Sequence, residues 1–215
     1  MKLVVISPEN YEPREHAVLA QLLAAGLKRY HVRKPAWDYH ALRNYLRVVP
    51  EEWRSRLVLH QHHGLANELG CGGMHFKDSK GGARTLGGSR LSESPSANAN
   101  LFTSRSCHTL ETLEAALGHF SSVFFSPVFP SISKFDHLPA VELSDVSALL
   151  ARRTEPQRTT KVVALGGIKP ENCVRALELG FDGVAVLGAL WNADRPVTVF
   201  EQLQRALTSH VAGAA

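Results

Sequence analysis

The sequence predicts a single (β/α)₈ TIM barrel, because short apolar segments alternate with helical patterns along the whole chain. Several of these segments are almost continuously apolar, as expected for strands buried on both faces of a parallel sheet. A length of 215 residues, 44% of them hydrophobic, suits one such domain over 1–215. The eight expected strands are 3–7, 29–33, 57–60, 73–76, 101–106, 123–126, 161–165 and 183–187.

Helical patterns lie between these strands. Thr109 and the acidic residues after it predict a capped helix start, and Pro170 with Gly180 brackets another helix. A long irregular stretch, 77–100, follows the fourth strand on the face where barrels place their active sites. The expected helices are 17–24, 64–69, 109–117, 144–150, 170–179 and 196–207.

Composition narrows the class of partner. The net charge of +4 is modest and the basic residues form no long run, so an anionic small molecule is expected and nucleic acid is not. The three cysteines fit no metal framework and read as reduced thiols. No apolar stretch reaches the roughly 18–20 residues of a membrane span. We therefore expect a cytoplasmic protein without a membrane partner; a homodimer is left open.

Glycines occupy matched positions at the ends of the last two expected strands. Gly166 and Gly167 follow the seventh strand, and Leu187 and Gly188 end the eighth. Glycine lets backbone N–H groups approach an anion closely, and barrels commonly build a phosphate site at this place. Tight turns without a ligand are the alternative, but the matched pair favours phosphate.

The loop after the sixth strand carries hydroxyl groups and a cation. Ser131, Ser133 and Lys134 are suited to orient a polar or anionic ligand. The alternative is a solvated loop whose prolines only fix its path.

Histidines gather after the third strand, at His60, His62 and His63. Imidazoles this close can bind zinc or nickel. Consecutive residues rarely point at one ion, however, so a polar loop without a metal is favoured. His75, within the fourth strand, is expected to pack inside the barrel with a hydrogen-bonded ring.

Residues 103–191 carry motifs whose order and spacing resemble a known family. The segments are 105–111, 126–130 with Lys134, 163–168 and 183–186, with looser matches at 30–34 and 70–76. They resemble the family that contains thiamine phosphate synthase and the TenI-type thiazole tautomerase. The resemblance implies a barrel that acts in thiamine biosynthesis and binds thiazole phosphate or a similar small phosphorylated ligand.

The chain departs from the synthase pattern after its second strand. The resemblance implies a Gln-x-Arg-x-Lys set that grips a pyrimidine diphosphate. Here His31 stands for the Gln, Arg33 matches, and Pro35 stands for the Lys. In a synthase, Arg33, Lys34 and Lys80 would handle the diphosphate.

The metal-binding positions of the synthase pattern also differ. The resemblance implies Asn-Asp after the third strand and a second Asp after the fourth, which hold magnesium. Those places carry His60-Gln61 and Lys80, with Asp78 two positions away. Magnesium prefers hard oxygen ligands, so no cofactor is firmly implied; Mg²⁺ with Asp78 is expected only of a synthase.

His108 matches the Ser-x-His context that the resemblance links to the tautomerase. Moving a thiazole proton from one atom to another suits an imidazole, whose pKa lies near neutrality. A helix-entry role beside Thr109 is the alternative.

Three interpretations follow. The first is a TenI-like protein in which His108 moves the proton and the expected ligand-binding residues are Arg33, Ser131, Ser133, Lys134, Gly166, Gly167, Leu187 and Gly188. The second is a thiamine phosphate synthase in which the diphosphate or polar contacts are His31, Lys34, His60 and Lys80. The third is a non-catalytic regulator that binds a phosphorylated ligand.

Overall fold

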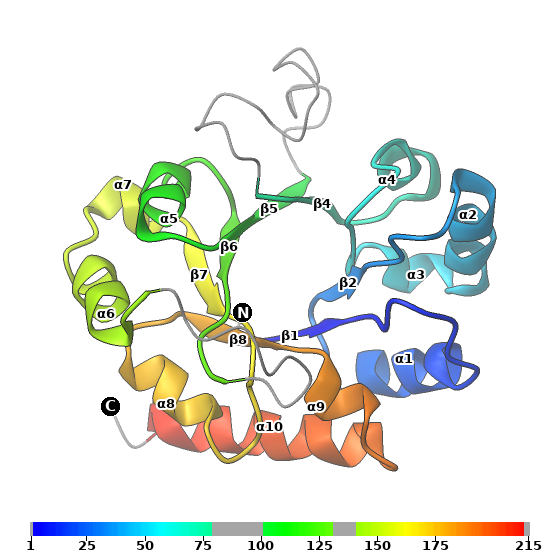
Figure 1. The fold of residues 1–215 in the computed structure, drawn as a ribbon. Coiled ribbons are helices and arrows are strands. Elements are labelled where there is room, and N and C mark those ends of the chain that lie inside the picture. Colours follow the sequence, from blue (N-terminus) through cyan, green and yellow to red (C-terminus); the bar gives the residue numbers. More distant parts are fainter. Residues whose placement is uncertain (1, 79–100, 131–140, 213–215) are drawn as a thin grey trace.

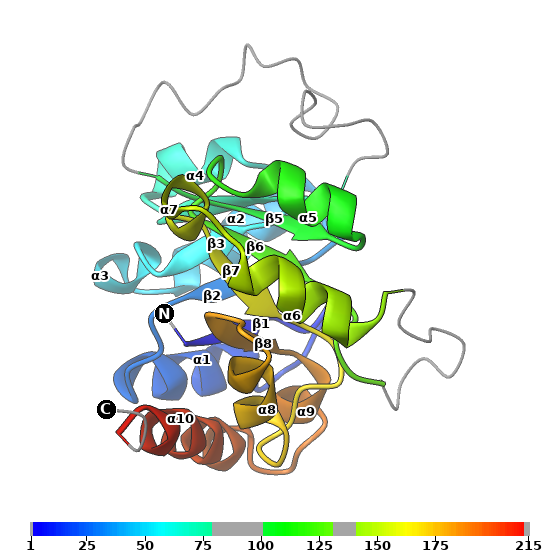
Figure 2. The same ribbon diagram turned by 90° about the vertical axis from the view of Figure 1, so that its left-hand side faces the viewer.

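The computed structural model describes residues 2–78, 101–130 and 141–212, and for residues 211 and 212 it describes the backbone alone. Eight parallel strands form a closed barrel in sequence order, and β8 pairs with β1. Figures 1 and 2 show the helices arranged around the outside of the strands. The strands are β1 Leu3–Ile6, β2 Tyr30–Val32, β3 Leu57–Leu59, β4 Gly73–Phe76, β5 Phe102–Cys107, β6 Ser122–Phe125, β7 Lys161–Ala164 and β8 Gly183–Val186.

The predicted barrel and its eight strands are confirmed, each strand end within one residue of its expected place. Of the irregular stretch 77–100, residues 79–100 lie outside the described part of the chain. In the described part of the chain, no helix combines the length and apolar character needed to cross a bilayer. The helices are α1 Glu15–Ala24, α2 Tyr39–Val48, α3 Glu51–Arg54, α4 Gly64–Leu69, α5 Leu110–Ala116, α6 Leu143–Ala151, α7 Glu155–Arg158, α8 Cys173–Glu178, α9 Gly188–Trp191 and α10 Pro196–Ala212.

One expected helix start is wrong. Helix α8 begins at Cys173 and not at Pro170, because Asn172 holds the preceding residues in a turn. Its side-chain oxygen accepts from Lys169 N at 2.8 Å, and its amide nitrogen donates to Gly167 O at 2.9 Å. The Pro170 signal therefore marks a turn that leads into the helix.

The larger apolar core lies between the barrel and its helices, and a smaller one fills part of the barrel interior. The inner apolar cluster comes from β1, β6, β7 and β8, and consists of Val4, Ile6, Phe124, Val163 and Ala185. The side of the interior built by β2, β4 and β5 carries buried polar residues instead, including His31, His75 and Ser104. The interior is thus apolar on one side and polar on the other.

A buried ion pair ties β2 to the first helices. Lys34, fully buried just after β2, places Nζ 2.5 Å from a carboxylate oxygen of Glu15 in α1. It also donates to Pro8 O at 2.7 Å. The other Glu15 oxygen accepts from the hydroxyls of Tyr30 at 2.8 Å and Tyr45 at 2.6 Å. Burial, with the Glu15 carboxylate close by, raises the pKa of both hydroxyls well above its usual value, so both remain donors.

This pair corrects the expected role of Lys34 as a diphosphate contact. Its ammonium group has no exposed surface and is already bonded to a carboxylate and to backbone carbonyls. A buried charge is stable only when it is paired and hydrogen-bonded, and Lys34 meets that condition inside the protein. We therefore remove it from the expected ligand contacts.

We predict that Glu15→Gln destabilises the fold by about 3–5 kcal/mol, because it leaves the Lys34 ammonium buried without its counter-charge. Urea unfolding followed by circular dichroism measures the change. The matched control is Glu178→Gln, which removes the exposed partner of Arg175 and should change stability by less than about 0.5 kcal/mol. Equal effects for both variants would contradict a structural role for the buried pair.

Candidate functional site

The residues expected at the site follow different strands but lie at one end of the barrel. Arg33 follows β2, His60 follows β3, Asp78 follows β4, His108 follows β5 and Gly188 follows β8. All strands of the barrel are parallel, so their carboxyl ends meet at the same rim, where barrel enzymes place their active sites. This rim is the candidate site.

His108 stands exposed at the rim with a fixed ring orientation. Its Nδ1 lies 2.8 Å from the backbone oxygen of Ser126, which follows β6. A carbonyl only accepts, so Nδ1 carries the proton and Nε2 keeps a lone pair in the neutral ring. The neighbouring residue Thr109 starts the helix, because its side chain caps α5 and accepts a hydrogen bond from Thr112 N at 3.1 Å.

Asp78 is held in place by contacts beside His108. One carboxylate oxygen accepts from Arg105 at 3.3 Å, and the other accepts from the backbone N–H of His108 at 3.3 Å. Arg105 alternates along β5 with Ser104 and Ser106, so its side chain leaves the face of the strand that lines the interior. Asp78 therefore anchors His108 and does not offer a free carboxylate to the interior.

Gly166 and Gly167 are required by packing. Both have positive φ angles, +95° and +65°. A Cβ at Gly167 would lie 2.6 Å from Pro130 O, and one at Gly166 would lie 2.9 Å from Pro127 Cα. The loop after β7 thus packs backbone to backbone against the loop after β6, whether or not a ligand binds.

Gly188 differs from that pair. It opens α9, and a Cβ there would meet only Asn192 Nδ2 at 3.6 Å, an ordinary contact. The first turn of a helix has N–H groups without intrahelical acceptors, and these suit an anion. Trp191, at the other end of α9, donates to Ile6 O at 2.8 Å and fixes the short helix to β1. Strands β7 and β8 pair directly, so the two glycine loops are neighbours.

Arg33 lies at the rim, partly exposed, in an ion pair with Glu9. The backbone on both sides of it is secured by Ser7, whose hydroxyl donates to Arg33 O at 3.1 Å and accepts from Arg33 N at 2.8 Å. Arg33 remains a candidate contact for an anionic ligand. The other expected contacts Lys80, Ser131, Ser133 and Lys134 lie outside the described residues.

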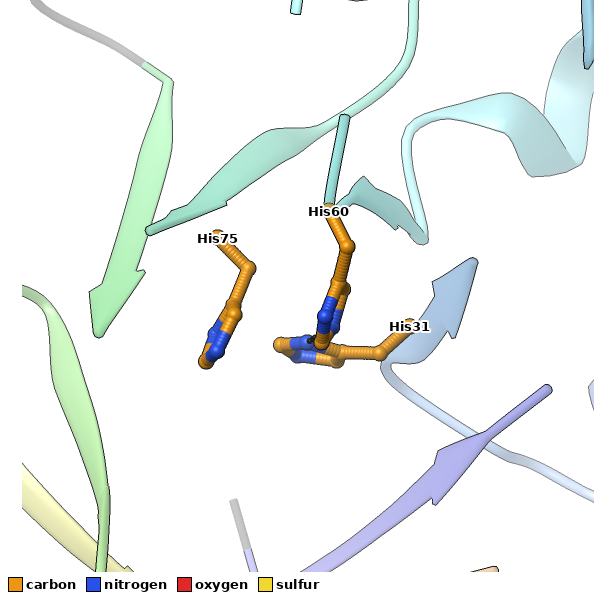
Figure 3. A group of neighbouring side chains, drawn as sticks. All are labelled: His31, His60 and His75. Carbon is orange, nitrogen blue, oxygen red and sulfur yellow. Dashed lines mark hydrogen bonds between the residues drawn. The ribbon is translucent and has the colours of Figure 1, made fainter. Parts of the chain in front are cut away.

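Three histidines from neighbouring strands meet inside the barrel, and Figure 3 shows their rings directed toward one another. His31 Nδ1 lies 3.1 Å from His60 Nε2, and the His60 and His75 rings stack with centroids 4.0 Å apart. His75 Nδ1 and Nε2 lie 2.9 Å and 2.8 Å from the hydroxyls of Ser104 and Ser106. The expected hydrogen-bonded packing of His75 is confirmed.

Burial makes all three rings neutral at physiological pH. Loss of hydration lowers the pKa of His75 to about 3 and holds the pKa values of His31 and His60 well below the usual range. His31 is fully buried, so it does not stand at the rim as the expected diphosphate contact would.

The run His60-Gln61-His62-His63 does not act as one cluster. His62 Nε2 lies 3.0 Å from Trp37 O, and His63 Nε2 lies 3.1 Å from His75 O. Only His60 joins the histidines in the interior. Sequence reasoning missed this grouping because it compared neighbours along the chain; the available signal was one histidine in or after each of three consecutive strands.

Among the described residues, the site offers few of the hard oxygen ligands that magnesium prefers. Magnesium needs hard oxygen ligands, whereas the grouped metal-ligating side chains are imidazoles and both Asp78 oxygens are already bonded. The rim instead presents the exposed imidazole of His108 and the glycine that opens α9, Gly188.

Comparison with known proteins identifies the family. The family model described as thiamine monophosphate synthase matches residues 3–190. A thiamine-phosphate synthase from Chromobacterium violaceum is 30% identical over 208 residues, covering 89% of each chain. One from Lysinibacillus sphaericus is 24% identical over 198 residues, covering 87% of each.

Solved structures agree in fold. A thiamine phosphate pyrophosphorylase from Bacteroides thetaiotaomicron has a TM-score of 0.73 at 24% identity, covering 97% of this chain and 98% of that one. One from Pyrococcus furiosus has a TM-score of 0.76 at 18% identity, covering 97% and 96%. Since the family model spans most of the sequence, this chain belongs to the thiamine monophosphate synthase (TMP-TENI) family.

Proposed function

We propose that the protein acts in thiamine biosynthesis as a TenI-like thiazole tautomerase that binds thiazole phosphate at the rim of the barrel. The observation that carries this proposal is the 2.8 Å contact between His108 Nδ1 and Ser126 O, which assigns a proton to Nδ1 and leaves Nε2 as the nitrogen that can exchange one. The ring is exposed, so its Nε2 is accessible to a ligand. Family membership supports a role in thiamine biosynthesis, and the position of His108 supports proton transfer on the thiazole ring.

The proposed chemistry is a proton transfer by one side chain. His108 Nε2 accepts a proton from the thiazole ring and returns it to a different atom of the same ring. The contact of Nδ1 with Ser126 O stays in place throughout and stabilises the imidazolium that forms between the two steps. The substrate phosphate would bind the N–H groups at Gly188, beside the loop at Gly167. Ser131, Ser133 and Lys134 are proposed, from sequence alone, to line the thiazole side.

Synthase activity is the second candidate. Its support comes from the relatives, since the thiamine-phosphate synthase of Chromobacterium violaceum matches along most of both chains. Against it stands the presence of His60-Gln61 where the resemblance implies Asn-Asp, while Asp78 is bonded to Arg105 and to His108 N. A non-catalytic binder of a phosphorylated ligand remains a third outcome of the tests below.

We predict that His108→Asn lowers the rate of tautomer turnover by about 10²–10⁴-fold and changes thiazole phosphate affinity only a few-fold. Asparagine can still donate to Ser126 O but cannot shuttle a proton. Turnover is followed by the change in thiazole absorbance, and affinity by calorimetry.

The matched control is His119→Asn, an exposed histidine that precedes β6 at the opposite end of the barrel, and it should behave as the parent. Parent-like turnover by His108→Asn would remove His108 from the mechanism. Affinity without turnover in the parent protein would instead indicate the non-catalytic binder.

We also predict that Gly188→Glu abolishes binding of thiazole phosphate, because a carboxylate would occupy and repel the phosphate site. Gly188→Ala should bind within a few-fold of the parent, since its Cβ meets only Asn192 at 3.6 Å. Calorimetry measures binding, and thermal unfolding checks that both variants fold. Undiminished binding by Gly188→Glu would place the phosphate elsewhere.

Magnesium-dependent synthesis separates the two enzyme candidates. We expect no thiamine phosphate from pyrimidine diphosphate and thiazole phosphate, with or without Mg²⁺, because the described site lacks free carboxylates. The synthase from Chromobacterium violaceum serves as the positive control of the assay. Robust Mg²⁺-dependent product formation would overturn the tautomerase proposal, and Asp78→Asn would then test the remaining carboxylate.

A further inference from the structure

The three histidines in the barrel interior carry an inference that is independent of the proposed tautomerase. They come from β2, from the residue after β3, and from β4, and one ligand nitrogen of each lies within 4.8 Å of the others. Figure 3 shows all three side chains entering the same space. We propose that His31, His60 and His75 bind a divalent transition-metal ion of the zinc type.

An unsatisfied polar atom points to a missing partner in this space. His31 is fully buried, and its Nε2 has no hydrogen-bond partner among the described residues. The Nδ1 of the same ring is bonded to His60 Nε2 at 3.1 Å. Buried polar groups in folded proteins are almost always satisfied, and an exception calls for a water or an ion. A metal ion bound by the cluster would supply that partner.

The chemistry of the donors selects the kind of ion. Neutral imidazole is a preferred ligand of zinc, nickel, copper and cobalt, whereas magnesium takes oxygen. His31 and His75 are buried and His60 is partly buried, and an imidazole ring can offer one nitrogen lone pair to an ion. Three protein ligands leave a coordination position for water or an anion, as in catalytic zinc sites and unlike closed structural ones.

Small ring movements would complete the geometry. Zinc–nitrogen bonds of about 2.0–2.1 Å place tetrahedral ligand atoms about 3.4 Å apart, so the present separations of up to 4.8 Å must shorten. The hydrogen bond between His31 and His60 would be given up in favour of the metal. His75 would release one serine and keep the other, and such a hydrogen bond from a ligating ring to a neighbouring group is usual in metal sites. Ser104, fully buried on β5, is suited to that positioning role.

A purely hydrogen-bonded polar core is the competing explanation, and metal binding distinguishes the two. The full chain without an affinity tag is stripped with a chelator and titrated with Co²⁺, whose visible spectrum reports coordination number, and then with Zn²⁺ in competition with a chelating dye. We expect one ion per chain with a four-coordinate or five-coordinate cobalt spectrum, and no competition by Mg²⁺.

Three variants assign the ligands. His60→Gln should weaken zinc binding by more than roughly 100-fold, and Ser104→Ala by about 10–100-fold. His62→Gln is the matched control, because His62 lies two residues away but is bonded to Trp37 O, and it should bind as the parent. Circular dichroism checks that each variant folds.

A measurement on the parent protein keeps the test decisive if His60→Gln fails to fold. Two-dimensional ¹⁵N–¹H spectra of histidine side chains should show three rings whose nitrogens shift when Zn²⁺ is added. The proposal is overturned if the parent binds no zinc, if His62→Gln loses binding while His60→Gln keeps it, or if the shifted rings belong to exposed histidines. None of these outcomes depends on tautomerase activity, so the two proposals stand or fall separately.

Discussion

The pairing of β8 with β1 is the constraint on which the rest of the molecule depends. Leu3 lies opposite Val184 and Val5 opposite Val186, and these contacts close a sheet that would otherwise have two open edges. A closed parallel barrel has only one rim of carboxyl ends. Residues as distant in sequence as Arg33, His108 and Gly188 therefore lie at one end of the molecule.

Closure also creates an interior whose two sides have different chemistry. The side built by β1, β6, β7 and β8 is lined mainly by aliphatic residues and Phe124, although Ser122 of β6 is also fully buried. Phe124 also contacts the rings of His31 and His75, at centroid distances of 4.7 Å and 5.0 Å. The apolar side thus shields these polar groups from water, while they hydrogen-bond to one another and to the serines of β5.

The fold was largely predictable from sequence because strands buried on both faces leave a local signal, an uninterrupted apolar run. Helix α2 was missed although its signal was present: Asp38 caps it, and Leu42, Tyr45 and Leu46 have helical spacing. Short helices such as α9 have too few residues for any periodicity.

The site was less predictable than the fold, because its groups interact across strands. His108 Nδ1 contacts Ser126 O, 18 residues away in sequence. Asp78 accepts a hydrogen bond from Arg105, which is 27 residues away. Lys34 shows the same limit: its position after β2 suggested the rim, but its partner Glu15 lies 19 residues earlier, and only the packed structure brings the two together. The local sequence pattern shows which residue types follow a strand. Tertiary contacts determine which of those residues can face a ligand.

The two glycine loops differ in what would preserve them during evolution. Gly166 and Gly167 are demanded by the backbone of 127–130, which comes within 3 Å of where their Cβ atoms would lie. Selection for folding alone would keep both in a relative that had lost its ligand. Gly188 has an ordinary backbone and room for a side chain, so folding does not protect it. If the phosphate binds at Gly188 as proposed, variation at position 188 among relatives of this barrel, and not at the glycine pair, would mark a lost or altered ligand.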